Sequence, residues 1–412
     1  MEEIMDIKHR TDSGFNADAI DHTTAADLAA VGSDKWTRYP GCIGAFIAEM
    51  DYGLAPCIQE AIDNACDHCK LGYIPEPWKQ RVAEACAGWQ RTHYGWNVNP
   101  SIIRVVPDVL EAYEVFLREL VGAGNSVIVP TPAYMPFLSV PKLYDVNVIE
   151  IEMLQSGDTE TGEAQWLFDF DAIEQAFANG CHAFVLCNPH NPVGKIWTPN
   201  ELADIGELCR RHGVTVLSDE IHCDLTDPGF GYTPFASVSE DCRDNSITCI
   251  AASKAFNLAG LQSAAVIIPD EFLRAKVVRG LNSDEVAEPN CFAAVAAAAA
   301  FGEGGEWLDS LRGYLAENKK AAFDFVAENL PEITPVMQNA TYLLWLDCGK
   351  ITDDAEKLAD FIRKNTGLYI SAGNKYRGNG NLFLRINVAC PKETVMRGMK
   401  LLRDGIRAFE KQ

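Results

Sequence analysis

The sequence Ala183-Phe-Val-Leu-Cys-Asn-Pro-His-Asn-Pro-Val-Gly194 joins an uninterrupted apolar run to a polar loop that contains two prolines. In residues 183–187 apolar and polar residues do not alternate, as they would in a strand with one solvent-exposed face. Both faces of this strand are therefore expected to be buried. Strands of this kind are typical of largely parallel sheets that helices cover on both sides. The prolines restrict the loop that follows, so its polar side chains should be held at a defined place beyond the strand.

Similar short runs, rich in β-branched residues, recur on both sides of this strand and alternate with helical stretches. They cover residues 102–106, 126–129, 147–151, 214–217, 247–251 and 264–268. This alternation predicts an α/β fold whose large domain is a three-layer α/β/α sandwich with a mostly parallel sheet.

The last hundred residues give a different order of helix and strand signals, with strands expected at 341–347 and 382–388. A smaller α+β domain built from both ends of the chain is the economical interpretation. We therefore expect residues 1–60 to form an N-terminal segment and part of the small domain, residues 61–300 the large domain, and residues 301–412 the small C-terminal domain.

Composition excludes several classes of protein. A formal charge of −23 without clustered Lys and Arg argues against nucleic acid as a partner. The most apolar stretch, 291–301, is about half of the roughly 20 residues that cross a bilayer, so we expect a buried helix and no membrane contact. Residues 1–10 are charged and lack a secretion signal, which predicts a cytoplasmic protein.

The fourteen cysteines are scattered along the chain, which favours reduced thiols over a disulfide framework. Cys66 and Cys69 are closely spaced, but no second pair stands at a zinc-binding distance in the sequence. We therefore expect no metal site.

Polar side chains follow four of the expected strands. Tyr134 comes after the strand at 126–129 in Thr131-Pro-Ala-Tyr134, and Asn191 lies in the proline loop. Asp219 ends the strand at 214–217 in Ser218-Asp-Glu-Ile-His222, and Lys254 follows the strand at 247–251. Ligands of open α/β sheets bind beyond the carboxyl ends of the strands, so these four groups should meet at one edge.

An aromatic ring, an amide, an acid and an amine together suit pyridoxal 5′-phosphate, a planar ring with an aldehyde and a phosphate. Lys254 would form a Schiff base with the aldehyde and then act as general base. Asp219 would pair with the ring nitrogen and keep it protonated, so that the ring withdraws electrons from the substrate Cα. Tyr134 would stack on the ring, and Asn191 would donate to its phenolate oxygen.

At this point the chain resembles the fold-type I pyridoxal-phosphate enzymes of the class I/II aminotransferase group. More narrowly it resembles the MalY/PatB-type cysteine-S-conjugate β-lyases, often called cystathionine β-lyases. The motifs that carry this second resemblance are Ala48-Glu-Met-Asp-Tyr52, Gly72-Tyr73, Thr131-Pro-Ala-Tyr134, Ser253-Lys-Ala-Phe-Asn-Leu-Ala-Gly-Leu-Gln262, Thr341-Tyr-Leu-Leu-Trp-Leu-Asp347 and Arg385-Ile-Asn-Val-Ala-Cys-Pro391.

The resemblance implies the same roles for Lys254, Asp219, Asn191 and Tyr134, and it makes Lys254, Tyr134 and Asp219 the catalytic residues. It adds several contacts to the cofactor phosphate. These would come from Ser253, from the backbone amides of Val109 and Leu110, and from Tyr73 of a neighbouring subunit.

A homodimer with shared active sites follows from the role of Tyr73. Arg385 would bind the α-carboxylate of a small amino-acid substrate with help from the backbone at Ala48. His222 would lie near the phenolate side of the ring or one layer behind it.

The implied reaction is β-elimination from an S-substituted cysteine such as cystathionine, giving a thiol, pyruvate and ammonia. Two alternatives stay open: an aminotransferase of aromatic or sulfur amino acids, and a regulatory protein that acts through a protein partner. The residues also leave the proton donor to the leaving thiolate open between Lys254 and Tyr134.

One residue departs from what a phosphate site favours. Asp108 stands directly before the helix that should bind the phosphate, where a carboxylate repels an anion. We expect its side chain to turn away and cap the helix.

Overall fold

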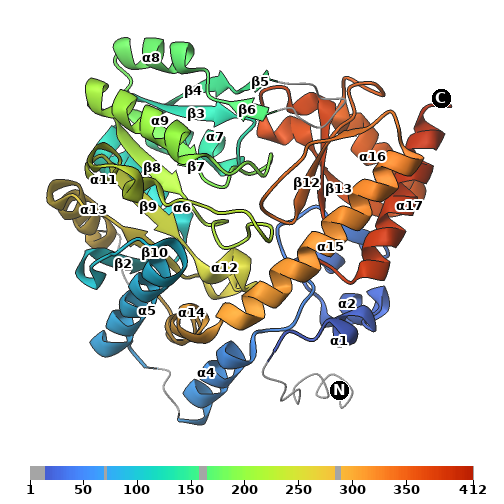
Figure 1. Ribbon diagram of the computed structural model, residues 1–412, viewed down its shortest axis with the longest axis horizontal. Helices are drawn as coiled ribbons and strands as arrows, with labels where there is room; N and C mark the ends of the chain where they lie inside the picture. The colour runs from blue at the N-terminus through green and yellow to red at the C-terminus, as the bar shows by residue number, and fades with distance from the viewer. Residues whose placement is uncertain (1–13, 69–71, 157–164, 284–288, 412) are drawn as a thin grey trace.

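The computed structural model describes residues 14–68, 72–156, 165–283 and 289–411, which form two β-sheets with helices packed around them (Figure 1). The seven-stranded sheet has the order β2-β10-β9-β8-β7-β3-β4. Its strands are β2 (Ile103–Val106), β3 (Ser126–Thr131), β4 (Asn147–Glu152), β7 (Ala183–Cys187), β8 (Thr215–Asp219), β9 (Ser246–Ile250) and β10 (Ala264–Ile267). All neighbours are parallel except β10, which is antiparallel to both β2 and β9.

The inner strands of this sheet are largely apolar on both faces because helices cover both. Val185 and Leu217 point to one face and pack with α6 (Val109–Phe116) and α13 (Glu271–Ser283). Phe184 and Val216 point to the other and pack with α8 (Phe170–Ala178) and α9 (Pro199–His212). Towards β2 and β10, α5 (Glu76–Tyr94) and α14 (Cys291–Glu303) continue the cover. The three-layer, mostly parallel large domain is therefore confirmed.

Local sequence explains where these helices begin and end. Thr198 accepts a hydrogen bond from the Glu201 amide at 3.2 Å, and the Glu201 carboxylate accepts from the Thr198 amide, which together form a capping box at the start of α9. The helix stops at Gly213, whose φ of 64° is the left-handed conformation that favours glycine. The next residues enter β8, so this stop fixes where Asp219 falls at the end of the strand.

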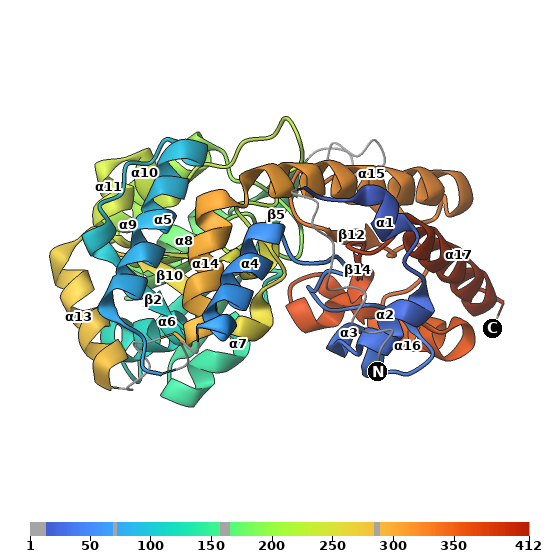
Figure 2. The same cartoon turned by 90° about the horizontal axis from the view of Figure 1, so that it is seen from below.

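The five-stranded sheet has the order β1-β13-β14-β12-β11 and draws on both ends of the chain. Its strands are β1 (Ile43–Ala45), β11 (Thr334–Pro335), β12 (Leu343–Asp347), β13 (Leu368–Ala372) and β14 (Phe383–Asn387). Helices α16 (Ala355–Thr366) and α17 (Lys392–Phe409) pack on each other beside it. The long helix α15 (Gly305–Asn329) runs from the large sheet towards this second sheet (Figure 2). The smaller α+β domain is confirmed as part of the fold, while the boundaries at residues 60 and 300 stay predictions.

The remaining elements are short or peripheral. They are α1 (Ala17–Asp21), α2 (Ala25–Val31), α3 (Asp34–Thr37), α4 (Pro56–Asp67), α7 (Pro136–Ser139), α10 (Phe235–Val238), α11 (Glu240–Asp244), α12 (Ala252–Ala255), β5 (Leu154–Ser156) and β6 (Gln165–Leu167). Within the described ranges no helix is both long and apolar enough to span a membrane, and no group of three or more His, Cys, Asp or Glu could hold a metal. Cys69 lies outside the described residues.

Two glycines allow the turn before β14 to fold tightly. A Cβ on Gly373 would lie 2.2 Å from the backbone oxygen of Gly380 and 2.6 Å from that of Phe383. A Cβ on Gly380 would lie 2.1 Å from the oxygen of Gly373. Only hydrogen fits between these backbones, so the glycines bring residues 373–380 against the strand that carries Arg385.

We expect Gly373→Ala to lower the stability by about 2 kcal/mol or more, because neither backbone can move away without disturbing the turn. The matched control is Gly313→Ala in the middle of α15, where an added Cβ meets nothing within 4 Å. This control should raise stability by about 0.5–1 kcal/mol, since alanine favours a helix. Thermal midpoints of both variants test the expectation, and equal midpoints would contradict it.

Candidate active site

Four neighbouring strands of the large sheet deliver the predicted polar residues to one edge. Strands β9, β8, β7 and β3 are adjacent and parallel, so their carboxyl ends lie together. Cys187 at the end of β7 pairs with Asp219, and Asp219 pairs with Cys249 of β9. The loops that carry Tyr134, Asn191 and Lys254 therefore leave the sheet beside Asp219, as the sequence predicted.

Asp219 is a buried carboxyl group, 4% exposed. Its Oδ1 accepts a hydrogen bond from the Ile221 amide at 3.1 Å. Burial raises its pKa to about 7, with a smaller contribution from the negative charge of Asp108, while Lys254 acts in the opposite direction. A cation placed beside this group would favour its ionised form.

Lys254 lies on α12, the short helix that follows β9. Its Nζ donates to the carbonyl oxygen of Ala48 at 3.4 Å. Burial lowers the pKa of the amine, and the positive charge of Arg385 lowers it further, although Asp108 and Asp219 oppose the shift. A lysine with a lowered pKa is more often neutral, which is the form that attacks a carbonyl and accepts a proton.

Arg385 is a buried cation, 4% exposed, in the middle of β14. Its Nη1 donates to Asn191 Oδ1 at 3.2 Å, its Nη2 donates to the Phe46 carbonyl at 2.7 Å, and its guanidinium lies 5.0 Å from the ring centre of Tyr376. Among the described residues Arg385 forms no ion pair, and its buried Nε has no hydrogen-bond partner. Since a buried charge is costly without a counter-ion, this arrangement suits a ligand carboxylate.

Residues 46–51 form an irregular segment, bent at residues 46–48, that passes between the two sheets beside Lys254 and Arg385. Side chains from both sheets hold its backbone. Asn387 donates to the carbonyls of Ile47 at 2.6 Å and Glu49 at 2.7 Å. Asn257 accepts from the Met50 amide and donates to its carbonyl, both at 2.9 Å. The segment thus fixes the backbone at Ala48 beside the amine of Lys254.

Sequence reasoning missed the roles of Asn257 and Asn387. Both stand in motifs that carried the family resemblance, three residues after Lys254 and two after Arg385. The only signal in the sequence was the asparagine itself at position 257, a residue type that tolerates the positive φ of 56° found there. The sequence alone does not show which backbone each amide will reach.

A buried ion pair anchors the end of this segment. Lys35 Nζ donates to Asp51 Oδ2 at 2.7 Å and to the Ala389 carbonyl at 3.1 Å, and Trp36 Nε1 donates to Asp51 Oδ1 at 2.8 Å. Breaking such a pair is costly, because it leaves an uncompensated buried charge. The pair therefore holds α3, which carries Lys35, against the end of this segment.

His222 lies in the buried interior of the site, 3% exposed, and its Nδ1 has no hydrogen-bond partner within the described residues. Burial lowers its pKa to about 3, and the nearby charges of Lys254 and Arg385 contribute. The ring is therefore neutral and can offer one donor and one acceptor. Whether it lies on the phenolate side of a ring or behind it stays a prediction.

The residues predicted to contact the phosphate lie on separate elements, and only Val109 and Leu110 are at the start of α6. Asp108 is the N-cap, and its carboxylate accepts from the Leu110 amide at 2.8 Å, so the predicted cap is confirmed. Ser253 is half-buried on α12, next to Lys254. Tyr73 is 99% exposed, so its side chain is free to reach another subunit. The phosphate roles of these residues and of Val109 stay predictions.

Tyr134 is half-buried between the end of β3 and α7, where its ring packs edge-on against Phe137 with centroids 5.6 Å apart. Burial raises the pKa of its hydroxyl to about 12, with smaller contributions from Asp108 and Asp219. The hydroxyl therefore keeps its proton at neutral pH.

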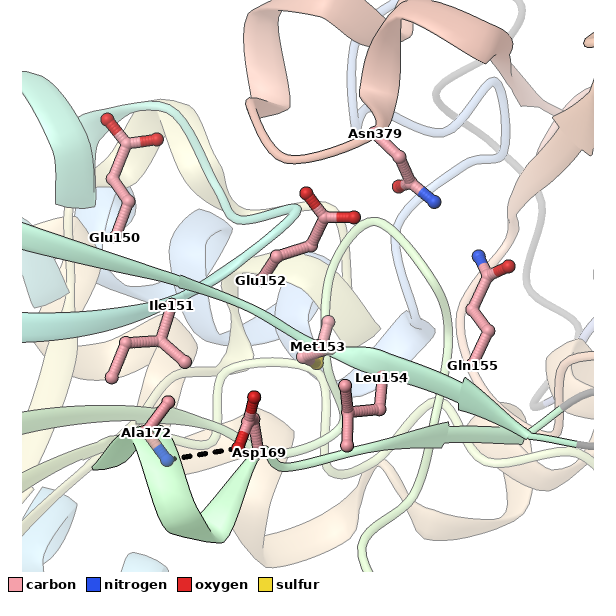
Figure 3. A pocket seen from close by; sticks show the side chains of 9 residues that line it. All are labelled: Glu150, Ile151, Glu152, Met153, Leu154, Gln155, Asp169, Ala172 and Asn379. Carbon is pink, nitrogen blue, oxygen red and sulfur yellow. Dashed lines mark hydrogen bonds between the residues drawn. The ribbon is translucent and has the colours of Figure 1, made fainter. Parts of the chain in front are cut away.

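A separate pocket of about 450 Å³ lies along β4, the edge strand of the large sheet (Figure 3). Glu150, Glu152 and Asp169 line it, together with Asn379 from the turn before β14, and its lining residues include no Lys, Arg or His. Asp169 is already engaged in capping α8 through the Ala172 amide at 3.0 Å. The pocket lacks the cations that an anionic ligand requires, so the strand ends remain the better site.

Comparisons with known proteins show the family to which the chain belongs. The family model described as aminotransferase class I and II matches residues 48–402. Cystathionine beta-lyase PatB of Bacillus subtilis is 35% identical over 381 residues, covering 91% of this chain and 96% of that protein. Protein MalY of Escherichia coli is 31% identical, covering 88% and 91%. The crystal structure of cystalysin from Treponema denticola, which contains pyridoxal 5′-phosphate, matches with a TM-score of 0.88 at 27% identity, covering 94% of this chain and 99% of that one.

The buried carboxyl of Asp219 makes the stability of the cofactor-free protein depend on pH. Its pKa is about 7 in the folded protein and about 4 in an unfolded chain. Its contribution to stability is thus full below about pH 4 and is lost as the pH rises through 7. We expect the thermal midpoint to fall less over this range in Asp219→Asn, which keeps an acceptor for the Ile221 amide. Glu220, whose pKa burial also raises to about 7, is present in both proteins, so an equal fall would contradict the assignment to Asp219.

Proposed function

Since the chain belongs to the aminotransferase class I and II family, we propose that it is a pyridoxal 5′-phosphate-dependent carbon–sulfur lyase that acts on S-substituted cysteines. One observation carries the proposal: the half-buried amine of Lys254 and the buried carboxyl of Asp219, at the edge of the large sheet, lie near the buried guanidinium of Arg385 from the small sheet, which has no counter-ion among the described residues. The names of the curated relatives favour a lyase over an aminotransferase or a protein with only a regulatory role, because cystathionine beta-lyase is the activity that several of them carry.

The residues present fit this cofactor. Lys254 would hold its aldehyde, Asp219 its ring nitrogen, Asn191 its phenolate oxygen, and Tyr134 one face of its ring. Ser253 and the amides at the start of α6 would hold the phosphate. When bound, the cofactor withdraws electrons from the substrate Cα and makes its C–H bond acidic. The raised pKa of Asp219 supports the pairing, because a cationic ring supplies the positive charge that the buried carboxyl lacks.

Arg385 binds the α-carboxylate of the amino acid in a bidentate manner, which gives the buried guanidinium its missing partner. Asn191 and the Phe46 carbonyl hold the guanidinium from one side and orient its remaining N–H groups. The segment at residues 46–51 lies beside this guanidinium, and Asn387 holds it in place by donating to the carbonyls of Ile47 and Glu49. Substrate position is therefore set by both sheets together.

Lys254 removes the α proton, and its lowered pKa makes the neutral amine available for this step. The bond between Cβ and sulfur then breaks, and the sulfur leaves as a thiolate that takes up a proton. Addition of water to the remaining fragment gives pyruvate and ammonia, so one substrate and one water yield three products.

The lysine that accepted the α proton is the better donor to the thiolate. A thiol has an ordinary pKa of about 8.5, whereas burial holds that of Tyr134 at about 12, so transfer from the tyrosine would be uphill. Tyr134 then serves to orient the ring and the leaving group. The nearly complete exposure of Tyr73 supports a homodimer in which this side chain reaches the partner's phosphate site.

The test of the function is an assay of the purified protein with L-cystathionine, in which pyruvate and free thiol are measured together. We expect equal amounts of both products from the wild-type protein. Lys254→Ala should lose activity by a factor of about 10³ or more, because base and attachment point are both removed. Turnover of an amino acid with a keto acid, without release of pyruvate and thiol from S-substituted cysteines, would contradict the lyase.

We expect Arg385→Lys to raise the KM for the amino acid by about 10- to 100-fold, because an ammonium cannot form the bidentate pair. Steady-state kinetics with L-cystathionine measure the change, and the affinity for the cofactor should stay near the wild-type value. An unchanged KM in this variant would contradict the proposal that Arg385 binds the α-carboxylate.

A further inference from the structure

The N-terminus of α6 carries a carboxylate at the place where the phosphate of the proposed cofactor would bind. Asp108 Oδ1 accepts the hydrogen bond of the Leu110 amide at 2.8 Å. The side chain caps the second residue of the helix and points its negative charge at the helix end. One of the two backbone amides expected to hold the phosphate is therefore already engaged by a side chain of this chain.

The effect of the Asp108 charge on neighbouring groups indicates that Asp108 lies close to the rest of the site. Its negative charge acts on the pKa of three site residues, raising those of Asp219 and Tyr134 and opposing the fall in that of Lys254. Asp108 is itself exposed in the described chain, so its side chain has room to turn outward. A phosphate dianion at the same helix end would meet a like charge within the range of unscreened interaction.

We propose that Asp108 is a built-in competitor of the cofactor phosphate, which holds the Leu110 amide in the cofactor-free protein and must release it when the phosphate binds. This proposal rests on the proposed function and adds one property to it. Because of Asp108, the chain binds its cofactor more weakly than the other residues of the site would allow. The same carboxylate stabilises α6 while no cofactor is present. Asp108 thus sets the balance between the cofactor-free and loaded forms.

Two variants separate the charge of Asp108 from its capping role. Asp108→Ser keeps a good N-cap and removes the charge, and Asp108→Asn keeps the size and the cap. The matched control is Asp169→Ser, which makes the same change at the N-cap of α8, where the aspartate accepts from the Ala172 amide. Thermal midpoints of the cofactor-free variants show whether each is folded.

The experiment measures the dissociation constant of pyridoxal 5′-phosphate from the cofactor-free protein, by fluorescence or absorbance titration. We expect Asp108→Ser and Asp108→Asn to bind about tenfold more tightly than wild type, since a like charge next to the phosphate is removed. The gain should shrink as salt is added. Asp169→Ser should bind as wild type does.

A second ligand isolates the phosphate. Pyridoxal, which has the same ring and aldehyde without the phosphate, should bind wild type and both Asp108 variants equally. The proposal that Asp108 competes with the phosphate would be overturned if both folded variants bound pyridoxal 5′-phosphate no more tightly than wild type. It would also be overturned if their affinity for pyridoxal rose as much as their affinity for pyridoxal 5′-phosphate. In either case saturable binding by the wild type would leave the proposed function standing, whereas a wild-type protein that binds no pyridoxal 5′-phosphate would overturn both.

Discussion

The buried guanidinium of Arg385 is the contact on which the two halves of the site depend. It lies on the small sheet, donates to Asn191 in a loop of the large sheet, and donates to Phe46 in the segment that passes between them. Each neighbour gives it a neutral oxygen, and within the described chain none gives it a negative charge. Such a cation is costly to bury without a counter-ion, so its neutral partners must be held rigidly in place, and a bound carboxylate would compensate its charge.

The rigidity comes from hydrogen bonds that run along residues 46–51. Asn387 holds two of the carbonyls, Asn257 holds Met50, and the buried pair of Lys35 and Asp51 fixes the end. The contacts of Asn257 and Asn387 link residues more than 200 positions apart in the sequence. The proposed substrate site is therefore built by both sheets, although the proposed catalytic residues Lys254 and Asp219 come from one sheet edge.

The sequence was enough to predict the large sheet, because its inner strands are largely apolar runs between turn signals. The seven predicted strands differ from the observed ones only at their ends, by two residues at most. Strands β1 and β13 were missed. β1 has only three residues and β13 follows directly on Gly367, so neither shows a strand pattern of apolar residues that can be recognised in the sequence. The positions of Asp219 and Lys254 were predictable because Asp219 ends β8 and Lys254 follows closely on β9. Asn387 was not, because its partners lie some 340 residues away and only the fold brings them together.

The central claim is that Lys254 is the amine that carries the cofactor in this chain. The most direct test is borohydride reduction of the protein loaded with pyridoxal 5′-phosphate, followed by peptide mapping with mass spectrometry. The account predicts the pyridoxyl group on Lys254 and on no other lysine. A label on a different lysine, or an unlabelled Lys254 in a protein that has bound the cofactor, would contradict it.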